Sequence, residues 1–216
     1  MNKMRLYIVR HGETNMNKGK FLQGQTDSEL NEYGRELARK TRDGLADVNF
    51  DMAFTSPLKR AKETAQIILG DREVSLVDEL RIQEISFGEY EGLCFGKENY
   101  NVPDKDFYNF FEHPEKYVAP KDGESFGTVM ERTNDFLKEL CENKAYEDKT
   151  VLVSTHGCAL KAILANIVGN PVKDFWGEGV HPNCAVTIVD VKEGSARVVE
   201  EGKVYYEIEG ERYFRP

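Results

Sequence analysis

The sequence predicts an α/β fold in which helices cover both faces of a mainly parallel central sheet. Short apolar runs rich in β-forming residues alternate with amphipathic stretches of helical period, and the alternation continues along most of the chain. This pattern is typical of parallel strands joined by crossover helices. The predicted strands are residues 6–9, 51–55, 74–77, 150–154, 185–191 and 196–199. The predicted helices are residues 31–45, 58–69, 125–142 and 159–168.

Local signals support these elements in order. Residues 6–9 (LYIV) are a short apolar run, as expected of a strand buried on both faces. Within 31–45 apolar residues recur at helical spacing, and Asn31 is a suitable N-cap. The helix 58–69 stops at a Gly-Asp pair, and the strand 150–154 leads into an apolar helix.

One segment, residues 93–122, breaks the alternation of strands and helices. We expect it to be a small helical and aromatic cap inserted into one domain that spans residues 1–216. The chain is long enough for one sizeable α/β core and short for two. It contains no internal repeat, low-complexity tract or linker-like stretch.

Charge and composition exclude several classes of protein. The 29 Lys and Arg residues stand against 38 Asp and Glu, so the net charge is -9, which disfavours nucleic acids and anionic membranes as partners. No apolar run approaches the roughly 18 residues of a membrane span, and the first residues lack the apolar core of a signal peptide. The four cysteines lie far apart without a Cys-x-x-Cys pair. We therefore expect a cytoplasmic protein with reduced thiols.

Three predicted strands end in side chains suited to a phosphoryl group. The first strand leads into Arg10 and His11, the second into a helix whose first turn holds Arg60, and the fourth into His156. The carboxyl ends of parallel strands meet at one edge of a sheet. Guanidinium groups bind phosphoryl oxygens, and an imidazole can attack phosphorus. Taken singly, each residue has an ordinary structural explanation, but their joint placement favours phosphoryl transfer.

The motifs around these residues resemble the histidine phosphatase superfamily, also called phosphoglycerate mutase-like. Its signature Arg-His-Gly-Glu stands at residues 10–13, directly after the first strand. Further matching positions are Asn17, Gln23-Gly24, Asp27, Leu30, Gly34, SPLKRAKETA (56–65), EISFGEYEG (84–92), GES (123–125) and VLVSTHG (151–157). The resemblance covers most of residues 5–168, and the insertion is its least matched part.

This resemblance implies a phosphohistidine mechanism. His11 would be the nucleophile, and its neutral imidazole would attack phosphorus. Arg10, Arg60 and His156 would clamp the phosphoryl oxygens and neutralise the charge that builds up in the transition state. These four residues form the predicted catalytic centre.

The resemblance also implies an acid and further binding residues. Glu84 matches the family's acid/base carboxylate, which protonates the leaving oxygen and then deprotonates water. Without the family match, nothing distinguishes it from the neighbouring surface glutamates. Asn17 would add a side-chain N–H donor, and Gln23 and Gly24 are further substrate-binding candidates.

The remaining chemistry-bearing residues indicate neither a metal nor an organic cofactor. His113 and His181 each precede proline and lack a metal-ligand spacing, so we expect loop residues. Cys158 could be imagined as a thiol nucleophile, but we expect a small buried residue. The stretch GLCFGK is one residue shorter than an ATP-binding loop and lacks the Ser or Thr that should follow it. Residues 177–179 lack the third glycine of a dinucleotide motif.

The signature motifs are shared by phosphatases and mutases, and the insertion favours a phosphatase. A mutase must retain a doubly phosphorylated intermediate, and the family's true mutases carry an arginine-rich cap in this region. Residues 93–122 hold four lysines, no arginine and six carboxylates, a net charge of -2. We therefore predict a phosphomonoesterase of small phosphorylated metabolites, with phosphoglycerate mutase as the alternative. The aromatic residues of the insertion are Phe95, Tyr100, Phe107, Tyr108, Phe110, Phe111 and Tyr117, and a minority would line the pocket for a partly apolar leaving group.

Two questions remain, whether the chain is catalytic and whether it forms a dimer. A non-catalytic, phosphate-binding relative is disfavoured, because such a protein would be expected to have lost part of the motif set. The segment after Gly202 contains Tyr205, Tyr206, Ile208, Tyr213 and Phe214. It could pack on its own core or on a second copy, so a homodimer is possible.

Overall fold

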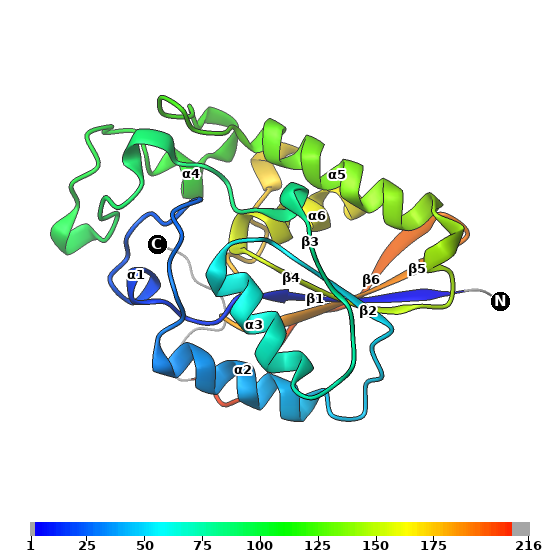
Figure 1. Ribbon diagram of the computed structural model, residues 1–216. Coiled ribbons are helices and arrows are strands. Elements are labelled where there is room, and N and C mark those ends of the chain that lie inside the picture. Colours follow the sequence, from blue (N-terminus) through cyan, green and yellow to red (C-terminus); the bar gives the residue numbers. More distant parts are fainter. Residues whose placement is uncertain (1–2, 209–216) are drawn as a thin grey trace.

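The computed structural model describes residues 3–208 and contains one six-stranded sheet (Figure 1). The strands are β1 (Met4–Arg10), β2 (Met52–Thr55), β3 (Leu76–Asp78), β4 (Thr150–Thr155), β5 (Val186–Lys192) and β6 (Ser195–Lys203), in the order β3-β2-β4-β1-β5-β6. The strands β1 to β4 pair in parallel, whereas β5 runs antiparallel to β1 and β6. This confirms the predicted mainly parallel α/β sheet.

Helices cover both faces of the sheet, as predicted. In Figure 1, α2 (Glu32–Gly44) and α3 (Lys59–Leu69) lie below the sheet, and α5 (Phe126–Glu142) and α6 (Gly157–Val168) lie above it. The side chains of β1 alternate between these layers. Leu6 and Ile8 join the core under α5 and α6, while Tyr7 and Val9 join the core that includes residues of α3. Because both faces are buried, β1 reads as a continuous apolar run.

Several short elements connect these layers. They are α1 (Asn15–Lys18), α4 (Asn109–Glu112) and the 3-10 turns η1 (Leu80–Ile82), η2 (Gly88–Tyr90), η3 (Lys97–Asn99), η4 (Pro114–Lys116), η5 (Lys144–Tyr146) and η6 (Val172–Asp174). The sequence does not predict α1, since four residues carry no apolar period. Its N-cap Thr14 and Asn17 instead form a capping box, in which each side chain bonds the other residue's backbone.

Some boundaries differ from the predictions. The strand β3 begins two residues later than predicted, because it lies at the sheet edge with mostly exposed side chains and so has a weak apolar signal. The helix α6 begins two residues earlier, at Gly157, because His156 has extended backbone and serves as its N-cap. The strand β6 is longer than predicted, reaching Lys203.

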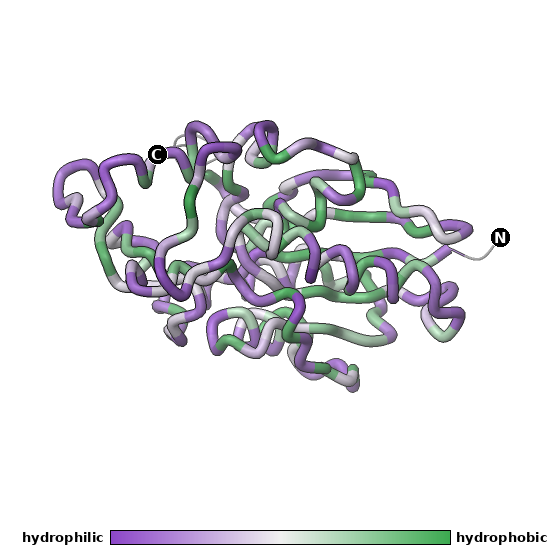
Figure 2. Tube along the Cα trace, turned by 90° about the horizontal axis from the view of Figure 1, so that it is seen from above, coloured by the Kyte–Doolittle hydropathy of each residue, from purple (hydrophilic) through white to green (hydrophobic). Residues whose placement is uncertain are grey.

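The segment 93–122 packs its aromatic side chains against the end of the molecule that includes Phe87 and Phe126. Phe107 and Phe110 are almost fully buried in this aromatic cluster, which also takes in Trp176. Figure 2 shows hydrophobic residues concentrated in the strands that run through the middle of the molecule, with hydrophilic stretches mainly around them. Within residues 3–208 no helix is both long and apolar enough to cross a membrane.

The start of the C-terminal segment packs on the chain's own core. Tyr205 contacts the core that includes Tyr7 and Phe50, and the hydroxyl of Tyr206 donates to the carbonyl of Asn183. Tyr213 and Phe214 lie outside the described residues.

Candidate active site

A pocket of about 100 Å³ lies at the edge where β1, β2 and β4 end. The predicted residues that line it are Arg10, His11, Asn17, Gln23, Gly24, Arg60 and Glu84. His156 is not among the lining residues, but its ring centroid lies 5.1 Å from that of His11. The register explains the convergence, because Arg10 pairs with Thr155 and Thr55 pairs with Ser154. Three strands that lie far apart in the sequence therefore end side by side at this edge of the sheet.

His11 is held in the tautomer that a nucleophile needs. Its Nδ1 lies 2.7 Å from the carbonyl oxygen of Gly12. A carbonyl can only accept, so Nδ1 carries the proton and Nε2 keeps its lone pair. Burial lowers the pKa of His11 well below its usual value, and the charges of Arg60 and Arg10 lower it further. The imidazole is therefore neutral at physiological pH.

Two arginines line the pocket and donate to backbone carbonyls. Arg60 Nη1 donates to the carbonyl of Thr26 at 2.8 Å and Nη2 to that of Gly24 at 2.6 Å. Arg10 donates through Nη1 to the carbonyl of His181. Among the described residues, the buried Nε atoms of both arginines have no hydrogen-bond partner. Burial lowers the pKa of Arg60 to about 10, which leaves it charged at neutral pH.

His156 is buried and oriented by a serine that the sequence analysis did not single out. Its Nε2 lies 2.8 Å from Ser56 Oγ, at the start of the SPLKRAKETA motif. Its Nδ1 is buried and has no hydrogen-bond partner within residues 3–208. Burial, followed by the charge of Arg60, lowers the pKa of His156 well below its usual value. Position in the motif was the available signal for Ser56.

The carboxylate of Glu84 lies at the N-terminus of α6. Its Oε1 accepts from the backbone N–H groups of Cys158 and Ala159, each at 3.1 Å, and from that of Ile85 at 3.0 Å. Free N–H groups and the helix dipole make this a favourable place for a carboxylate. The contact places Glu84 beside the His156-Gly157 turn.

The other predicted binding residues also line the pocket. Asn17 Oδ1 accepts from the backbone N–H of Thr14 at 3.1 Å, so the amide nitrogen is the group left to donate. Gln23 Oε1 accepts from the hydroxyls of Thr14 at 2.9 Å and Ser28 at 2.8 Å. Gly24 has a φ of 48° and supplies its carbonyl to Arg60.

The remaining wall of the pocket is apolar. Three of the seven predicted cap aromatics, Phe95, Phe110 and Phe111, line it. Phe21, Phe87 and Trp176 line it from outside the cap, and no sequence signal identified them. Phe21 is 40% exposed, so it can meet a bound molecule without first leaving the core.

Cys158 is among the residues that line the pocket, whereas the two remaining histidines are not. Cys158 is buried as predicted, and burial raises the pKa of its thiol well above the usual value, so the thiol stays protonated. His113 is exposed in a loop. His181 is also in a loop but is buried, and its Nε2 lies 3.0 Å from Glu201 Oε1. Across the described part of the chain no group of three His, Cys, Asp or Glu side chains could hold a metal ion.

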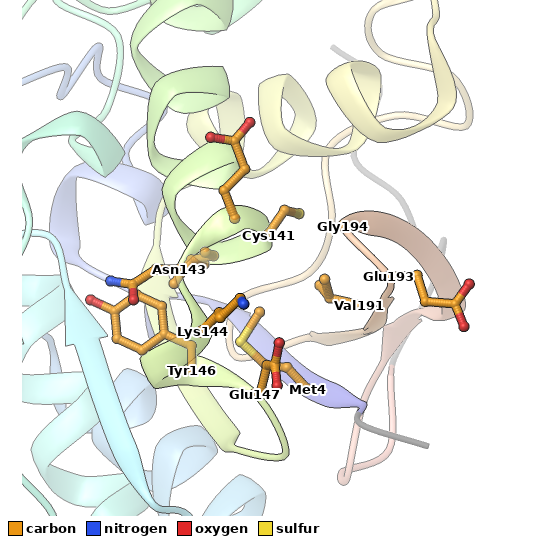
Figure 3. Close-up of a pocket in the computed structure, with 11 residues that line it drawn as sticks. Met4, Cys141, Asn143, Lys144, Tyr146, Glu147, Val191, Glu193 and Gly194 are labelled. Carbon is orange, nitrogen blue, oxygen red and sulfur yellow. The ribbon is translucent and has the colours of Figure 1, made fainter.

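A separate pocket of about 140 Å³ lies beside Met4, at the amino end of β1 and thus away from the site (Figure 3). Cys141, Tyr146 and Glu193 are among its lining residues. None of the predicted site residues lines it, so the phosphoryl chemistry belongs to the pocket around His11.

Comparisons with known proteins agree with this geometry. The family model of the histidine phosphatase superfamily (branch 1) matches residues 6–203. The chain is 35% identical to the uncharacterized phosphatase PhoE of Bacillus subtilis, over 75% of this chain and 76% of that protein. It is 30% identical to phosphoserine phosphatase 1 of Hydrogenobacter thermophilus, over 88% of each. The structure of Bacillus stearothermophilus YhfR superposes with a TM-score of 0.85 at 33% identity, covering 93% of this chain and 98% of that one. The chain therefore belongs to the histidine phosphatase superfamily.

Proposed function

We propose that this protein is a phosphomonoesterase that hydrolyses small phosphate esters through a phosphohistidine on His11. The observation that carries the proposal is the state of the His11 ring, which is buried, neutral and protonated on Nδ1. Its Nε2 lone pair shares the pocket with donor groups of two arginines. Phosphatases among the relatives, PhoE and phosphoserine phosphatase 1, support the same reaction class.

In the first step, His11 Nε2 attacks phosphorus and the bond from phosphorus to the ester oxygen breaks. The Nε atoms of Arg10 and Arg60 and Nδ1 of His156 are the buried groups available to the phosphoryl oxygens. We assign them the binding of the charge that develops on these oxygens. Asn17, Gln23 and Gly24 line the same pocket and are the further groups that we assign to substrate binding.

Glu84 is the proposed acid and base. It gives a proton to the departing ester oxygen, which leaves as an alcohol. It then takes a proton from the water that attacks the phosphohistidine, and the N–P bond breaks to release phosphate and neutral His11. The overall class is a phosphoric monoester hydrolase of the histidine acid phosphatase type.

The aromatic wall favours a partly apolar leaving group. Phe95, Phe111 and Trp176 face the same pocket as His11. The alternative, a phosphoglycerate mutase, would require cationic groups near the mouth to retain a second phosphoryl group. Residues 93–122 contain no arginine, which argues against this alternative.

A phosphorus NMR time course separates the two activities. The substrate is 3-phosphoglycerate with a trace of 2,3-bisphosphoglycerate, followed by p-nitrophenyl phosphate in a second sample, without added metal. A phosphatase releases inorganic phosphate from at least one ester without forming 2-phosphoglycerate. Growth of the 2-phosphoglycerate signal with little phosphate would establish the mutase instead. His11→Ala should abolish either activity, and wild-type turnover in this variant would contradict the phosphohistidine mechanism.

A further inference from the structure

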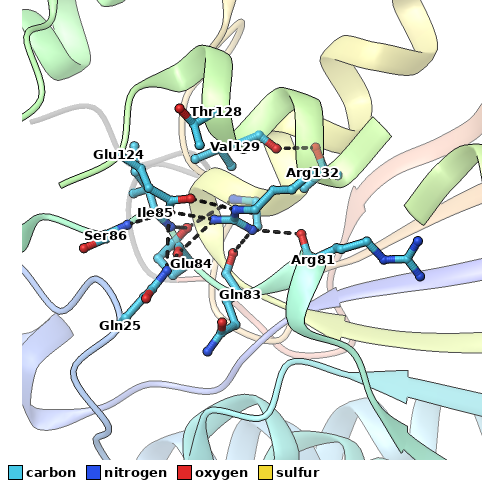
Figure 4. A network of polar contacts seen from close by, with 12 residues as sticks. Gln25, Arg81, Gln83, Glu84, Ile85, Ser86, Glu124, Thr128, Val129 and Arg132 are labelled. Atoms are coloured by element: carbon cyan, nitrogen blue, oxygen red, sulfur yellow. Dashed lines mark hydrogen bonds and ion pairs between the residues drawn. The ribbon is translucent and has the colours of Figure 1, made fainter. Parts of the chain in front are cut away.

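One side chain of α5 binds the loop that carries Glu84. The guanidinium of Arg132 donates through Nη1 to the carbonyls of Arg81 and Gln83, at 2.8 and 2.7 Å. Through Nη2 it donates to the carbonyl of Glu84 itself, at 3.0 Å. These three carbonyls lie within the Glu84 loop, which we define as residues 81–86. Figure 4 shows the guanidinium surrounded by them.

A carboxylate completes the set of partners around Arg132. Glu124 accepts from Arg132 Nε through Oε1 at 2.9 Å and from Nη2 through Oε2 at 3.0 Å. All five N–H donors of the guanidinium are thereby used. The Arg132 and Glu124 side chains are only 17% and 18% exposed, so solvent screens the pair weakly.

The Glu124 carboxylate also binds Ser86, at the other end of the Glu84 loop, and Gln25, which follows the pocket residue Gly24. Glu124 Oε2 also accepts from the backbone N–H of Ser86 at 2.9 Å. Gln25 Nε2 donates to the Glu84 carbonyl at 3.2 Å and to Glu124 Oε2 at 3.4 Å. Gln25 follows Gly24, whose carbonyl binds Arg60. The carbonyl of Glu84 thus accepts from two side chains, those of Arg132 and Gln25.

We propose that Arg132, oriented by Glu124, is a positioning residue that sets the place of the Glu84 carboxylate and so controls proton donation to the leaving oxygen. Arg132 is not among the described residues that line the pocket, so it acts through Glu84 rather than on the substrate. This inference rests on the proposed function, in which Glu84 is the acid.

Only arginine can fill this position. A lysine has three donors on one nitrogen and cannot reach three carbonyls while also forming a two-pronged contact with a carboxylate. Arg132→Lys therefore keeps the positive charge and removes the geometry. Because a proton transfer depends on donor and acceptor lying within hydrogen-bond reach, a loosened Glu84 loop should impair the acid step first.

The test compares two esters that differ in their need for an acid. The leaving group of p-nitrophenyl phosphate departs without protonation, whereas that of glycerol 2-phosphate requires it. The value of kcat/KM is used, since it reports steps up to departure of the leaving group. For Arg132→Lys we expect a drop of about 10-fold or more with glycerol 2-phosphate, because an acid contributes about 100-fold or more. With p-nitrophenyl phosphate we expect a change within about threefold on the same grounds.

Two further variants make the result specific. Arg5→Lys is the matched control, because Arg5 also forms a two-pronged contact with a carboxylate, that of Asp190 at 2.7 and 3.1 Å, but at the amino end of β1, away from Glu84. It should leave the ratio between the two esters unchanged. Glu84→Gln should give the same ester-dependent loss as Arg132→Lys, and the double variant should be no worse than Glu84→Gln alone.

The outcomes distinguish the positioning role of Arg132 from the proposed function on which it rests. An equal loss on both esters in Arg132→Lys, or additive losses in the double variant, would show a merely structural role and overturn the positioning proposal. If the wild-type protein hydrolyses neither these nor other esters, the proposed function fails and this inference fails with it. If Arg132→Lys does not fold, Glu124→Gln removes the orienting carboxylate charge and should show the same ester dependence.

Discussion

At the residue scale, burial decides what the charged groups of this site can do. The low pKa of His11 keeps a lone pair on Nε2, while burial brings Arg60 only to about 10 and leaves its charge in place. Near neutral pH the imidazole of His11 is therefore neutral while the guanidinium of Arg60 in the same pocket stays charged. This separation suits the attack of an imidazole on an anionic phosphoryl group.

Arg60 offers the sharpest test of that clamp. Arg60→Ala should lower kcat/KM by at least about 30-fold, or ~2 kcal/mol, since one lost transition-state donor costs roughly 2.7–4 kcal/mol in other enzymes. Steady-state kinetics with p-nitrophenyl phosphate measures the effect. Arg39→Ala is the control, because Arg39 is exposed on α2 and pairs only with Glu32 among the described ion pairs. Circular dichroism checks that the buried change leaves the fold intact, and a loss below threefold in a folded variant would contradict the assigned role.

At the element scale, α2 packs against the loop that follows β1 with no room for a side chain. A Cβ on Gly34 would lie 2.2 Å from the carbonyl oxygen of Glu13, and one on Gly12 would lie 2.7 Å from that of Gly34. The glycine pair thus lets backbone meet backbone directly behind His11. The position of the nucleophile depends on this helix as much as on its own strand.

Alanine substitution at matched helix glycines tests that contact. Gly34 is the third residue of α2 and Gly127 is the second residue of α5, where a Cβ would meet only Ser125 Oγ at 3.6 Å. Gly34→Ala should destabilise the protein and reduce turnover, because the backbone of the catalytic loop must move. Gly127→Ala should stabilise it by roughly 0.5–1 kcal/mol through helix propensity. Urea unfolding measures both, and equal effects would show that the close approach is unimportant.

At the scale of the whole molecule, three buried histidines link stability to pH. Burial lowers the pKa of His11, His156 and His181, whereas in the unfolded chain a histidine titrates near 6.5. Below about pH 6.5 the unfolded state binds more protons than the folded state, so the free energy of unfolding falls as pH falls. Between pH 7 and 5.5 His11 and His156, whose pKa values lie well below the usual one, should each remove roughly 1 kcal/mol of stability, and His181 adds to the loss. Glu201, whose pKa is lowered to about 2, loses its contribution only as pH falls from about 4.5, where a glutamate titrates in the unfolded chain, towards 2.

Urea titrations at pH 7 and 5.5 measure this slope. His181→Gln should make it shallower, because one titrating group is removed from the unfolded state. A wild-type stability that is flat across this range would contradict the assignment of buried neutral histidines.

The possible homodimer stays a prediction, and light scattering of the purified protein decides it.

The sequence by itself was enough to establish the succession of strands and helices along the chain, the mainly parallel sheet and the family. These properties depend on local patterns: the apolar run of β1 and the contiguous motifs at residues 10–13, 84–92 and 151–157. The same motifs identified the residues that meet at the pocket. His11 and His156 could be found because each directly follows a strand, and parallel strands end at a common edge, whereas Glu84 was found only through its match to the family.

Only the tertiary structure decided how those residues are held. The tautomer of His11 depends on the Gly12 carbonyl, and the location of Glu84 depends on the N-terminus of α6. The aromatic wall includes Phe21 and Trp176, which lie more than 150 residues apart in the sequence. The guanidinium of Arg132 binds three carbonyls that lie far from it in the sequence. Such contacts leave no periodic trace in the sequence, because they link single side chains to backbone groups that every residue carries.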